Sequence, residues 1–299
     1  MQSILKKVMK NRFVQILIWL GIMSVLTMLG MGLWLVFSGG SQTTESLKWL
    51  QLCQTLGTFL FPPIICAWIW DENRKPFRWL KMDQKVNWKS IVWAIGIMVL
   101  AIPAINLLAD LNSRVDLPES LDFIEQIFRR QEDAAAGLTE RFLKADNGWG
   151  LLINIGLLAF LPALSEELSF RGTLQQILGR NQVKESRVHI AIWVTAFVFS
   201  AIHLQFYGFV PRMLMGALFG YVFVWSGSLW VPIVMHFTNN GLAVLFYYLF
   251  DTNDASKSYA DTIGAGTTWW LGVISLLIVI ALVITFPDRR EYVRRTRTQ

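Results

Sequence analysis

Long apolar runs separated by short charged or polar connections dominate this chain. A helix needs about 20 apolar residues to cross a hydrocarbon core about 30 Å thick. Eight runs come close to that length or exceed it, and they are residues 13–37, 47–70, 90–108, 149–165, 188–204, 206–225, 229–250 and 268–286. The pattern predicts an all-α fold, a multi-spanning transmembrane bundle of about eight helices. The fourth and fifth runs are short and end on polar residues, so their ends are the hardest to place.

Lysine and arginine gather in alternate connections. They precede the first run, fill the connections 71–89 and 171–187, and recur in the tail from Arg289. The other side receives residues 38–47, 109–148 and the acidic, polar stretch 251–267. Short loops rich in Lys and Arg stay in the cytoplasm. With eight crossings, this alternation predicts that the N and C termini are both cytoplasmic.

One connection is long enough to form an element of its own. Within residues 109–148, Leu121, Ile124, Ile127 and Phe128 recur at helical spacing among acidic residues. This pattern is typical of an amphipathic helix at a membrane interface. Such a helix is either a simple connector or a gate for a substrate. We therefore divide the chain into N-terminal helices with this connector (1–147), a central helical core (148–250), and a last helix with a basic cytoplasmic tail (251–299).

Composition excludes the soluble and disordered classes. Of the 299 residues, 54% are hydrophobic and only 16% are charged, whereas soluble domains carry about 25% charged residues. The abundance of aromatic and branched residues excludes disorder. The net charge of +6 comes from short basic blocks between apolar runs. Because these blocks form no patch interleaved with exposed aromatic residues, we expect no nucleic-acid partner.

Ionisable side chains inside apolar runs are costly in a bilayer and are functional candidates by default. At the end of the fourth run, Glu167 and Arg171 are four residues apart, so they share a helical face and can pair. Glu166 is rotated about 100° from Glu167 and lacks such a local partner. It is therefore protonated, faces water or meets a partner from another helix. An unpaired carboxylate in an apolar pocket suits a general base that works near neutral pH.

Histidines on two other runs complete a possible catalytic set. Phe199 and His203 share one face of the fifth run, and His236 and Asn240 share one face of the seventh. A carboxylate, two imidazoles and a carboxamide could together activate a water molecule and stabilise an oxyanion. Taken singly, each histidine is more typical of an ordinary interhelical hydrogen bond. The third histidine, His189, lies at a helix entrance and is interpreted as a solvated interfacial residue.

Three patterns on successive apolar segments resemble those of one protein family. In chain order they are Glu166-Glu167-x-x-x-Arg171, Phe199-x-x-x-His203 and His236-x-x-x-Asn240. The set resembles the CAAX protease and bacteriocin-processing (CPBP, or Abi) family of intramembrane endopeptidases. The resemblance covers roughly residues 148–250, and it implies a catalytic helical core with a cavity that opens toward the membrane and the cytosol.

The resemblance also implies roles for the site residues. Glu166 and His203 would activate the attacking water, and His236 and Asn240 would stabilise the tetrahedral oxyanion. Arg171 would orient the glutamate helix through its partner. The supporting residues implied in this way are Glu167, Arg171 and Phe199.

The family further implies a membrane-associated peptide or protein as substrate, for example a lipid-modified C-terminal motif or a bacteriocin leader. It implies an integral, multi-pass protein of a bacterial cytoplasmic membrane, and we expect no cofactor. One alternative is a zinc protease, in which Glu166, His203 and His236 are the ligands and water is the fourth. Another is a non-catalytic immunity or scaffold protein, or a transporter, in which the same groups form a buried hydrogen-bond network.

The expected helix ends create one conflict. With the fourth run ending at residue 165, Glu166 lies near the cytoplasmic end of its helix, while His203 lies near the far end of its own. At 1.5 Å per residue the two would differ in depth by about 20 Å, too far to act together. Either the fourth helix continues past Arg171, or the fifth begins further out in the cytosol.

Overall fold

A computed structural model describes residues 11–179, 185–250 and 262–297. Within these ranges the chain forms helices and turns, without a strand. The described helices long and apolar enough to cross a membrane number seven, and an eighth apolar helix, Ser186–Ala201, is shorter. The chain is thus an integral, multi-pass membrane protein. The seven are Arg12–Ser38, Thr44–Trp70, Trp88–Ser113, Gly148–Gly179, Phe209–Ser226, Trp230–Phe250 and Gly266–Ile284.

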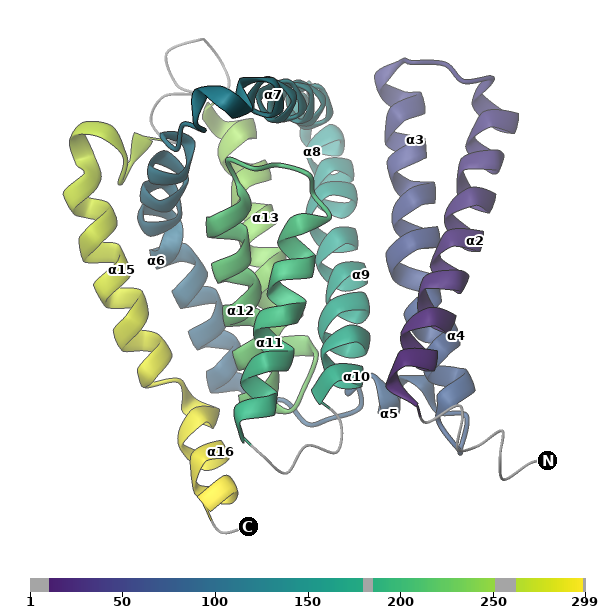
Figure 1. Cartoon of the computed structure of the whole chain (residues 1–299), viewed down its shortest axis with the longest axis vertical. Helices are drawn as coiled ribbons and strands as arrows, with labels where there is room; N and C mark the ends of the chain where they lie inside the picture. The colour runs from purple at the N-terminus through teal and green to yellow at the C-terminus, as the bar shows by residue number, and fades with distance from the viewer. Residues whose placement is uncertain (1–10, 180–184, 251–261, 298–299) are drawn as a thin grey trace.

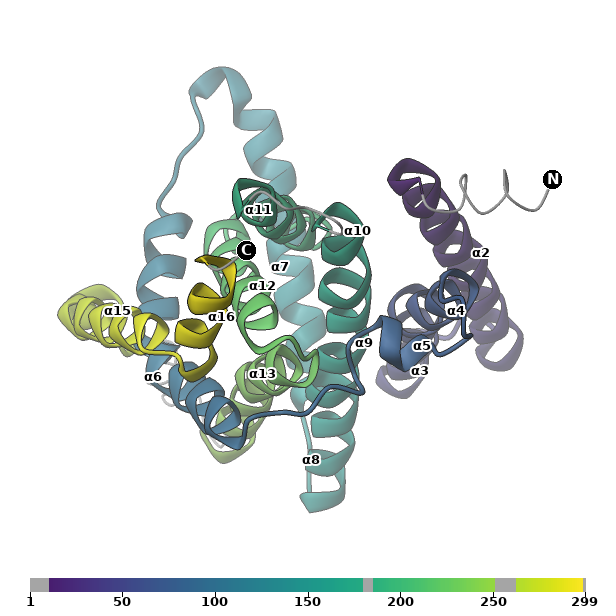
Figure 2. The same ribbon diagram turned by 90° about the horizontal axis from the view of Figure 1, so that it is seen from below.

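The described ends of the chain lie at the same end of the bundle (Figure 1). Helix α2 (Arg12–Ser38) starts there, and α16 (Pro287–Arg297) ends there. Helix α7 (Asp122–Leu143) lies across the opposite end, and the view from below shows it passing behind the bundle (Figure 2). This arrangement agrees with an even number of crossings. The basic residues expected at 1–10 and 180–184, and positions 251–261 of the expected acidic stretch, lie outside the described residues.

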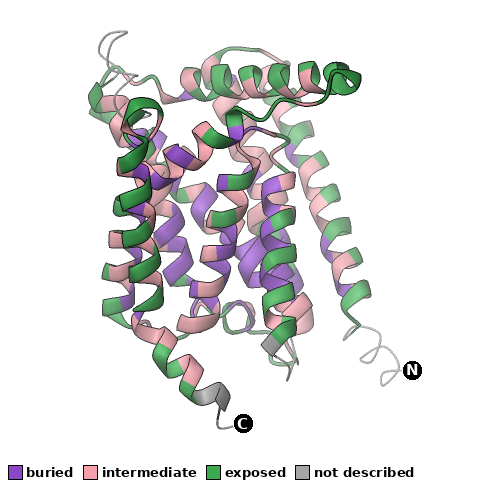
Figure 3. Ribbon diagram, turned by 60° about the vertical axis from the view of Figure 1, so that its left-hand side comes forward, coloured by how far each residue is buried: buried purple, intermediate pink, exposed green. Residues whose placement is uncertain are grey.

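Two helices at the edges of the bundle expose apolar side chains along most of their length. Helix α2 is at one edge and α15 (Trp269–Ile284) at the other (Figure 1). The exposed side chains include Leu29 and Phe37 on α2 and Leu277 on α15. Figure 3 colours the ribbon by burial, and much of α15 is in the exposed class. Such an apolar outer surface is what a lipid-facing helix requires, since its backbone groups are already satisfied within the helix.

The expected end of the fourth run at Ser165 is wrong. The helix continues without a break through α8 (Gly148–Asn154), η3 (Ile155–Phe160), α9 (Leu161–Ser169), η4 (Phe170–Gln175) and α10 (Gln176–Gly179). Proline cannot donate a backbone hydrogen bond, and the π-helical turn η3 accommodates Pro162 without ending the helix. Glu166 therefore lies about 20 Å inside the helix end at Gly179. Of the two solutions to the depth conflict, the structure supports the longer fourth helix.

The expected bounds between the fifth and sixth runs are also wrong. Helix α11 (Glu185–Ala201) ends before His203, and α12 (Phe209–Ser226) begins after the expected start at 206. Leu204 has a left-handed backbone, with φ of 55°, which ends a helix. Asn112, at the end of α6 (Trp88–Ser113), donates from Nδ2 to the Phe206 carbonyl (3.0 Å) and accepts from the Val210 amide (3.2 Å). The turn that carries His203 is thus fixed by α6.

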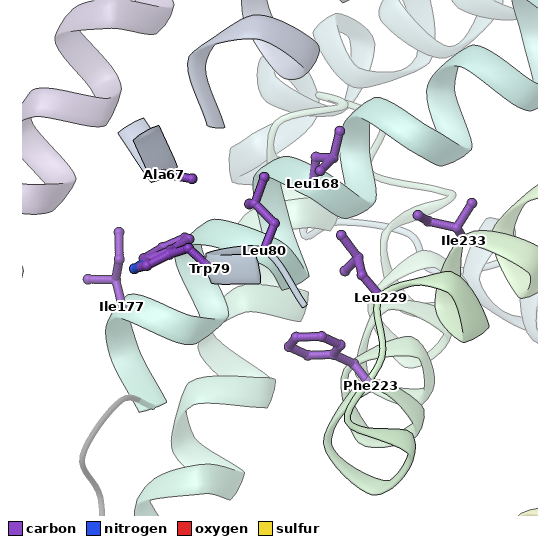
Figure 4. Packing of buried hydrophobic residues seen from close by; sticks show 8 residues of the cluster. All are labelled: Ala67, Trp79, Leu80, Leu168, Ile177, Phe223, Leu229 and Ile233. Atoms are coloured by element: carbon purple, nitrogen blue, oxygen red, sulfur yellow. The ribbon is translucent and has the colours of Figure 1, made fainter. Parts of the chain in front are cut away.

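A buried apolar cluster supports the bundle near its basic end. It involves the connection around α5 (Pro76–Trp79), which also makes polar contacts: the Lys81 carbonyl accepts from the Leu229 amide (3.0 Å), and Met82 accepts from the Trp230 indole (2.9 Å). Leu168 belongs to the cluster and directly follows Glu167 in the sequence, so this packing holds α9 in place. Figure 4 shows the cluster: Ala67, Trp79, Leu80, Leu168, Ile177, Phe223, Leu229 and Ile233.

Candidate active site

A fully buried ion pair forms the base of the candidate site. Arg171 Nη1 donates to Glu167 Oε1 at 2.6 Å, and both side chains are inaccessible to solvent. Arg171 Nη2 donates to the Gly216 carbonyl on α12 at 2.9 Å. A Cβ at Gly216 would lie 3.2 Å from the ring of Phe199, so glycine allows α12 to approach α11 this closely. The predicted pairing of Glu167 with Arg171 is confirmed.

Two aromatic rings hold the same guanidinium. The Cζ atom of Arg171 lies 4.7 Å from the ring centre of Phe199 and 5.3 Å from that of Phe219. Cation–π contacts of this kind compensate part of the cost of burying a charge. Phe199, which we expected as a supporting residue, therefore contacts the buried guanidinium.

His236, on α13 (Trp230–Phe250), lies between the two glutamates. Its Nδ1 is 3.0 Å from Glu167 Oε1, and its Nε2 is 3.9 Å from Glu166 Oε2. Because the Glu167 carboxylate is paired with Arg171 and only accepts, Nδ1 is the donor. Of the three states considered for Glu166, the structure thus supports a partner from another helix.

His203 reaches the same site through Phe199. Its Nδ1 lies 2.7 Å from the Phe199 carbonyl oxygen, and since a carbonyl only accepts, Nδ1 carries the proton. In the neutral ring, Nε2 then presents a lone pair. The Phe199 ring centre is 5.2 Å from that of His203 and 6.0 Å from that of His236. The structure therefore gathers both imidazoles around one phenylalanine.

Asn240 lies one helical turn after His236 on the same face of α13. The Asn239 carboxamide donates to Asn240 Oδ1 at 3.1 Å. This contact occupies the oxygen of Asn240 and orients its NH₂ group, which retains two donors.

The turn that carries His203 is covered by the connector helix α7. Phe128 stacks on Phe206 with ring centres 4.9 Å apart and planes inclined by 6°. The guanidinium of Arg129 lies 4.6 Å from the ring centre of Tyr207. The expected amphipathic helix therefore packs directly on the turn beside the candidate site.

Protein groups engage one nitrogen of each imidazole that the zinc alternative would use. Among residues 11–179, 185–250 and 262–297, no group of three or more His, Cys, Asp or Glu side chains is placed to hold a metal ion. His236 Nδ1 binds Glu167, and His203 Nδ1 binds a main-chain carbonyl. These contacts orient the two rings by protein groups.

Sequence reasoning missed three residues of the sixth apolar run. Phe219 contacts both Arg171 and His236, and Gly216 accepts a hydrogen bond from Arg171. The small-xxx-small spacing of Gly216 and Gly220 was an available signal for close helix packing. The third is Arg212, whose charge within an apolar run met the criterion for a functional candidate.

Comparison with known proteins agrees with the residue patterns. Residues 148–242, which contain all seven expected site residues, match a family model described as Type II CAAX prenyl endopeptidase Rce1-like. Over 103 residues the chain is 34% identical to the membrane-embedded CAAX protease MroQ of Staphylococcus aureus, covering 32% of this chain and 40% of that protein. Over 88 residues it is 31% identical to the uncharacterized protein YpbD of Bacillus subtilis, covering 28% and 40%. The chain thus spans less than half the length of either relative. No solved structure matches it.

Proposed function

Residues 148–242 of this chain belong to the CAAX protease family, and from that premise we propose that the protein is an intramembrane endopeptidase. It hydrolyses a peptide bond in a membrane-associated peptide or protein. The observation that carries the proposal is the position of His236, which lies between Glu166 and the buried pair of Glu167 with Arg171. An acid–base pair held by a buried counter-ion is a common arrangement for hydrolysis.

Glu166 is the proposed general base. Its carboxylate takes a proton from a water molecule, whose oxygen forms a bond to the carbonyl carbon of the substrate. His203 orients this water with the Nε2 lone pair, since its Nδ1 proton is engaged with Phe199. His203 and Glu166 thus play complementary parts in activating the water.

His236 and Asn240 are the proposed donors to the oxyanion. His236 donates from Nδ1 to Glu167, and its Nε2, on the side of Glu166, is the proposed donor to the oxyanion. Asn240 adds its NH₂ group, which Asn239 orients. Preorganised donors of this kind stabilise the charge that develops on the carbonyl oxygen.

Collapse of the tetrahedral intermediate completes the reaction. The C–N bond breaks, and the proton held by Glu166 passes to the leaving nitrogen. The products are one peptide with a new carboxylate and one with a new amine, and Glu166 is again ionised. The buried pair of Glu167 with Arg171 does not react; it holds His236 in position.

Comparative proteomics of membranes tests the proposal and identifies a substrate. Cells that contain the wild-type protein are compared with cells that contain Glu166→Gln at equal abundance. We expect at least one membrane-associated peptide or protein to be cleaved only with the wild type. Identical cleavage patterns in both cells would favour the non-catalytic alternative, a scaffold or immunity protein.

A further inference from the structure

Arg212 lies on the face of α12 that lines the candidate site. It precedes Gly216 by one helical turn and Phe219 by two, so the three side-chain positions share a face. Gly216 accepts from Arg171, and Phe219 contacts His236 with ring centres 5.5 Å apart. Arg212 therefore continues the site by one turn toward the connector α7. The mechanism above gives it no role.

One of the two terminal nitrogens of the Arg212 guanidinium donates no hydrogen bond in the described structure. Its Nη2 donates to Gln205 Oε1 at 2.5 Å, whereas Nη1 is buried and has no hydrogen-bond partner in the described structure. A guanidinium stays charged at any physiological pH. A buried donor without an acceptor costs free energy, so a ligand that supplies an acceptor binds there favourably.

The surroundings of Arg212 contain negative charge at a distance but no ion-pair partner in contact. Glu166 on α9 and Glu132 on α7 interact with it electrostatically, and His203 also senses its charge. Among the described residues, no carboxylate oxygen lies within 4.0 Å of its nitrogens, in contrast to Arg171. One Glu132 oxygen, Oε2, is likewise buried without a partner.

We propose that Arg212 binds a carboxylate of the substrate and thereby determines which peptides are cleaved. This inference rests on the proposed function. The carboxylate is either the C-terminal group of the peptide or an acidic side chain near the scissile bond, because both offer the two oxygens that a guanidinium binds. The subsite lies beside the turn that carries His203, where Arg212 binds Gln205.

The test uses the peptide that spans the cleavage site found by the proteomic comparison. It is synthesised with all its carboxylates, with an amidated C terminus, and with its acidic side chains replaced by amides. Each form is hydrolysed by purified wild-type protein, by Arg212→Gln and by Arg212→Lys. The matched control is Arg130→Gln, which removes an exposed arginine on α7.

We expect the wild type to lose on the order of 10- to 100-fold in kcat/KM, mainly through KM, when the recognised carboxylate is neutralised. The form that loses activity identifies the source of the carboxylate. Arg212→Gln should cleave all forms with the same low kcat/KM. Arg212→Lys should retain part of the preference because it keeps the charge but not the planar fork. Arg130→Gln should behave as wild type.

Two results would overturn the inference while leaving the proposed function intact. One is a wild-type protein that cleaves all three forms equally well, a result that does not depend on whether any variant folds. The other is a folded Arg212→Gln protein that keeps the wild-type preference. If the wild type cleaves no form, the proposed function fails, and this inference fails with it.

Discussion

At the residue scale, one carboxylate organises the site. Glu167 Oε1 accepts from Arg171 Nη1 at 2.6 Å and from His236 Nδ1 at 3.0 Å. The guanidinium in turn reaches the Gly216 carbonyl. Through these bonds three helices, α9, α12 and α13, hold one another, and His236 is held with its Nε2 3.9 Å from Glu166, the proposed base.

Removing Arg171 should therefore damage folding. Breaking a buried ion pair by deleting one partner costs about 3–5 kcal/mol, because the other charge stays buried. We expect Arg171→Ala to lower the midpoint of thermal unfolding in detergent strongly. Arg114→Ala is the matched control, since Arg114 pairs with Asp110 at 2.7 Å with the same spacing but is 62% exposed; such a pair contributes about 0–1 kcal/mol. An Arg171→Ala protein as stable as wild type but inactive would place Arg171 in the chemistry.

The metal content separates the two enzyme mechanisms. If His203 and His236 act as water acceptor and oxyanion donor, the purified active protein should contain much less than one metal ion per chain, and chelators should inhibit weakly. If both were zinc ligands, His203→Ala and His236→Ala should each lose metal together with activity. Elemental analysis of the wild type and both variants decides between them. Stoichiometric zinc that is lost in both variants would make the protein a metalloprotease.

At the element scale, close helix contacts depend on missing side chains. Gly57 lies in the π-helical turn η1 (Leu56–Leu60), where a Cβ would come within 2.5 Å of the Leu26 carbonyl oxygen on α2. A hydrogen bond of 2.7 Å between Thr27 and Thr58 joins the same two helices. A methyl group added at Gly57 would meet main-chain atoms of α2, so no change of side-chain rotamer could relieve the clash.

Gly57→Ala should force these helices apart. Overpacking typically costs about 1–3 kcal/mol, so we expect the unfolding midpoint in detergent to fall by several degrees. Gly21→Ala lies on the partner helix α2, with open space around its Cβ position, and should leave the midpoint unchanged or slightly raised. Equal midpoints for the two variants would show that the two helices do not pack as closely as the structure indicates.

Sequence reasoning works within single elements and fails where distant elements meet. The pair of Glu167 with Arg171 follows from the helical period, and the structure confirms it. Phe199 also contacts His203 as expected, although α11 ends at Ala201 and His203 lies in the turn that follows. The ends of α11 and α12 depend on Asn112, about 90 residues earlier in the chain, which no local pattern reveals. The fourth helix passes Pro162 through a π-helical turn, although proline usually indicates a boundary.

At the scale of the whole molecule, the expected alternation of basic connections corresponds to the two ends of the bundle. The connection around α5 lies at the same end as the start of α2, and α7 lies at the other (Figure 1). By the positive-inside rule the first end faces the cytoplasm. The connector and the turn that carries His203 then face the opposite side.

Labelling of introduced cysteines checks this orientation. In a protein with Cys53 and Cys66 replaced by alanine, single cysteines are placed at Asn73, in the basic connection, and at Gln131, on α7; both positions are exposed. With an intact cytoplasmic membrane, we expect an impermeant maleimide to label Gln131→Cys, and to label Asn73→Cys only after permeabilisation. The reverse pattern would place the connector in the cytoplasm.

The most direct test of the central claim is turnover by purified Glu166→Gln. The substitution replaces the proposed base by an amide of almost equal volume, and loss of a general base typically lowers the rate by about 10²–10⁴-fold. The measurement is single-turnover hydrolysis of the identified peptide, with thermal unfolding in detergent as the control for folding. The account predicts a protein as stable as wild type whose hydrolysis rate falls by at least about 100-fold. A folded Glu166→Gln protein with a rate near that of the wild type would contradict it.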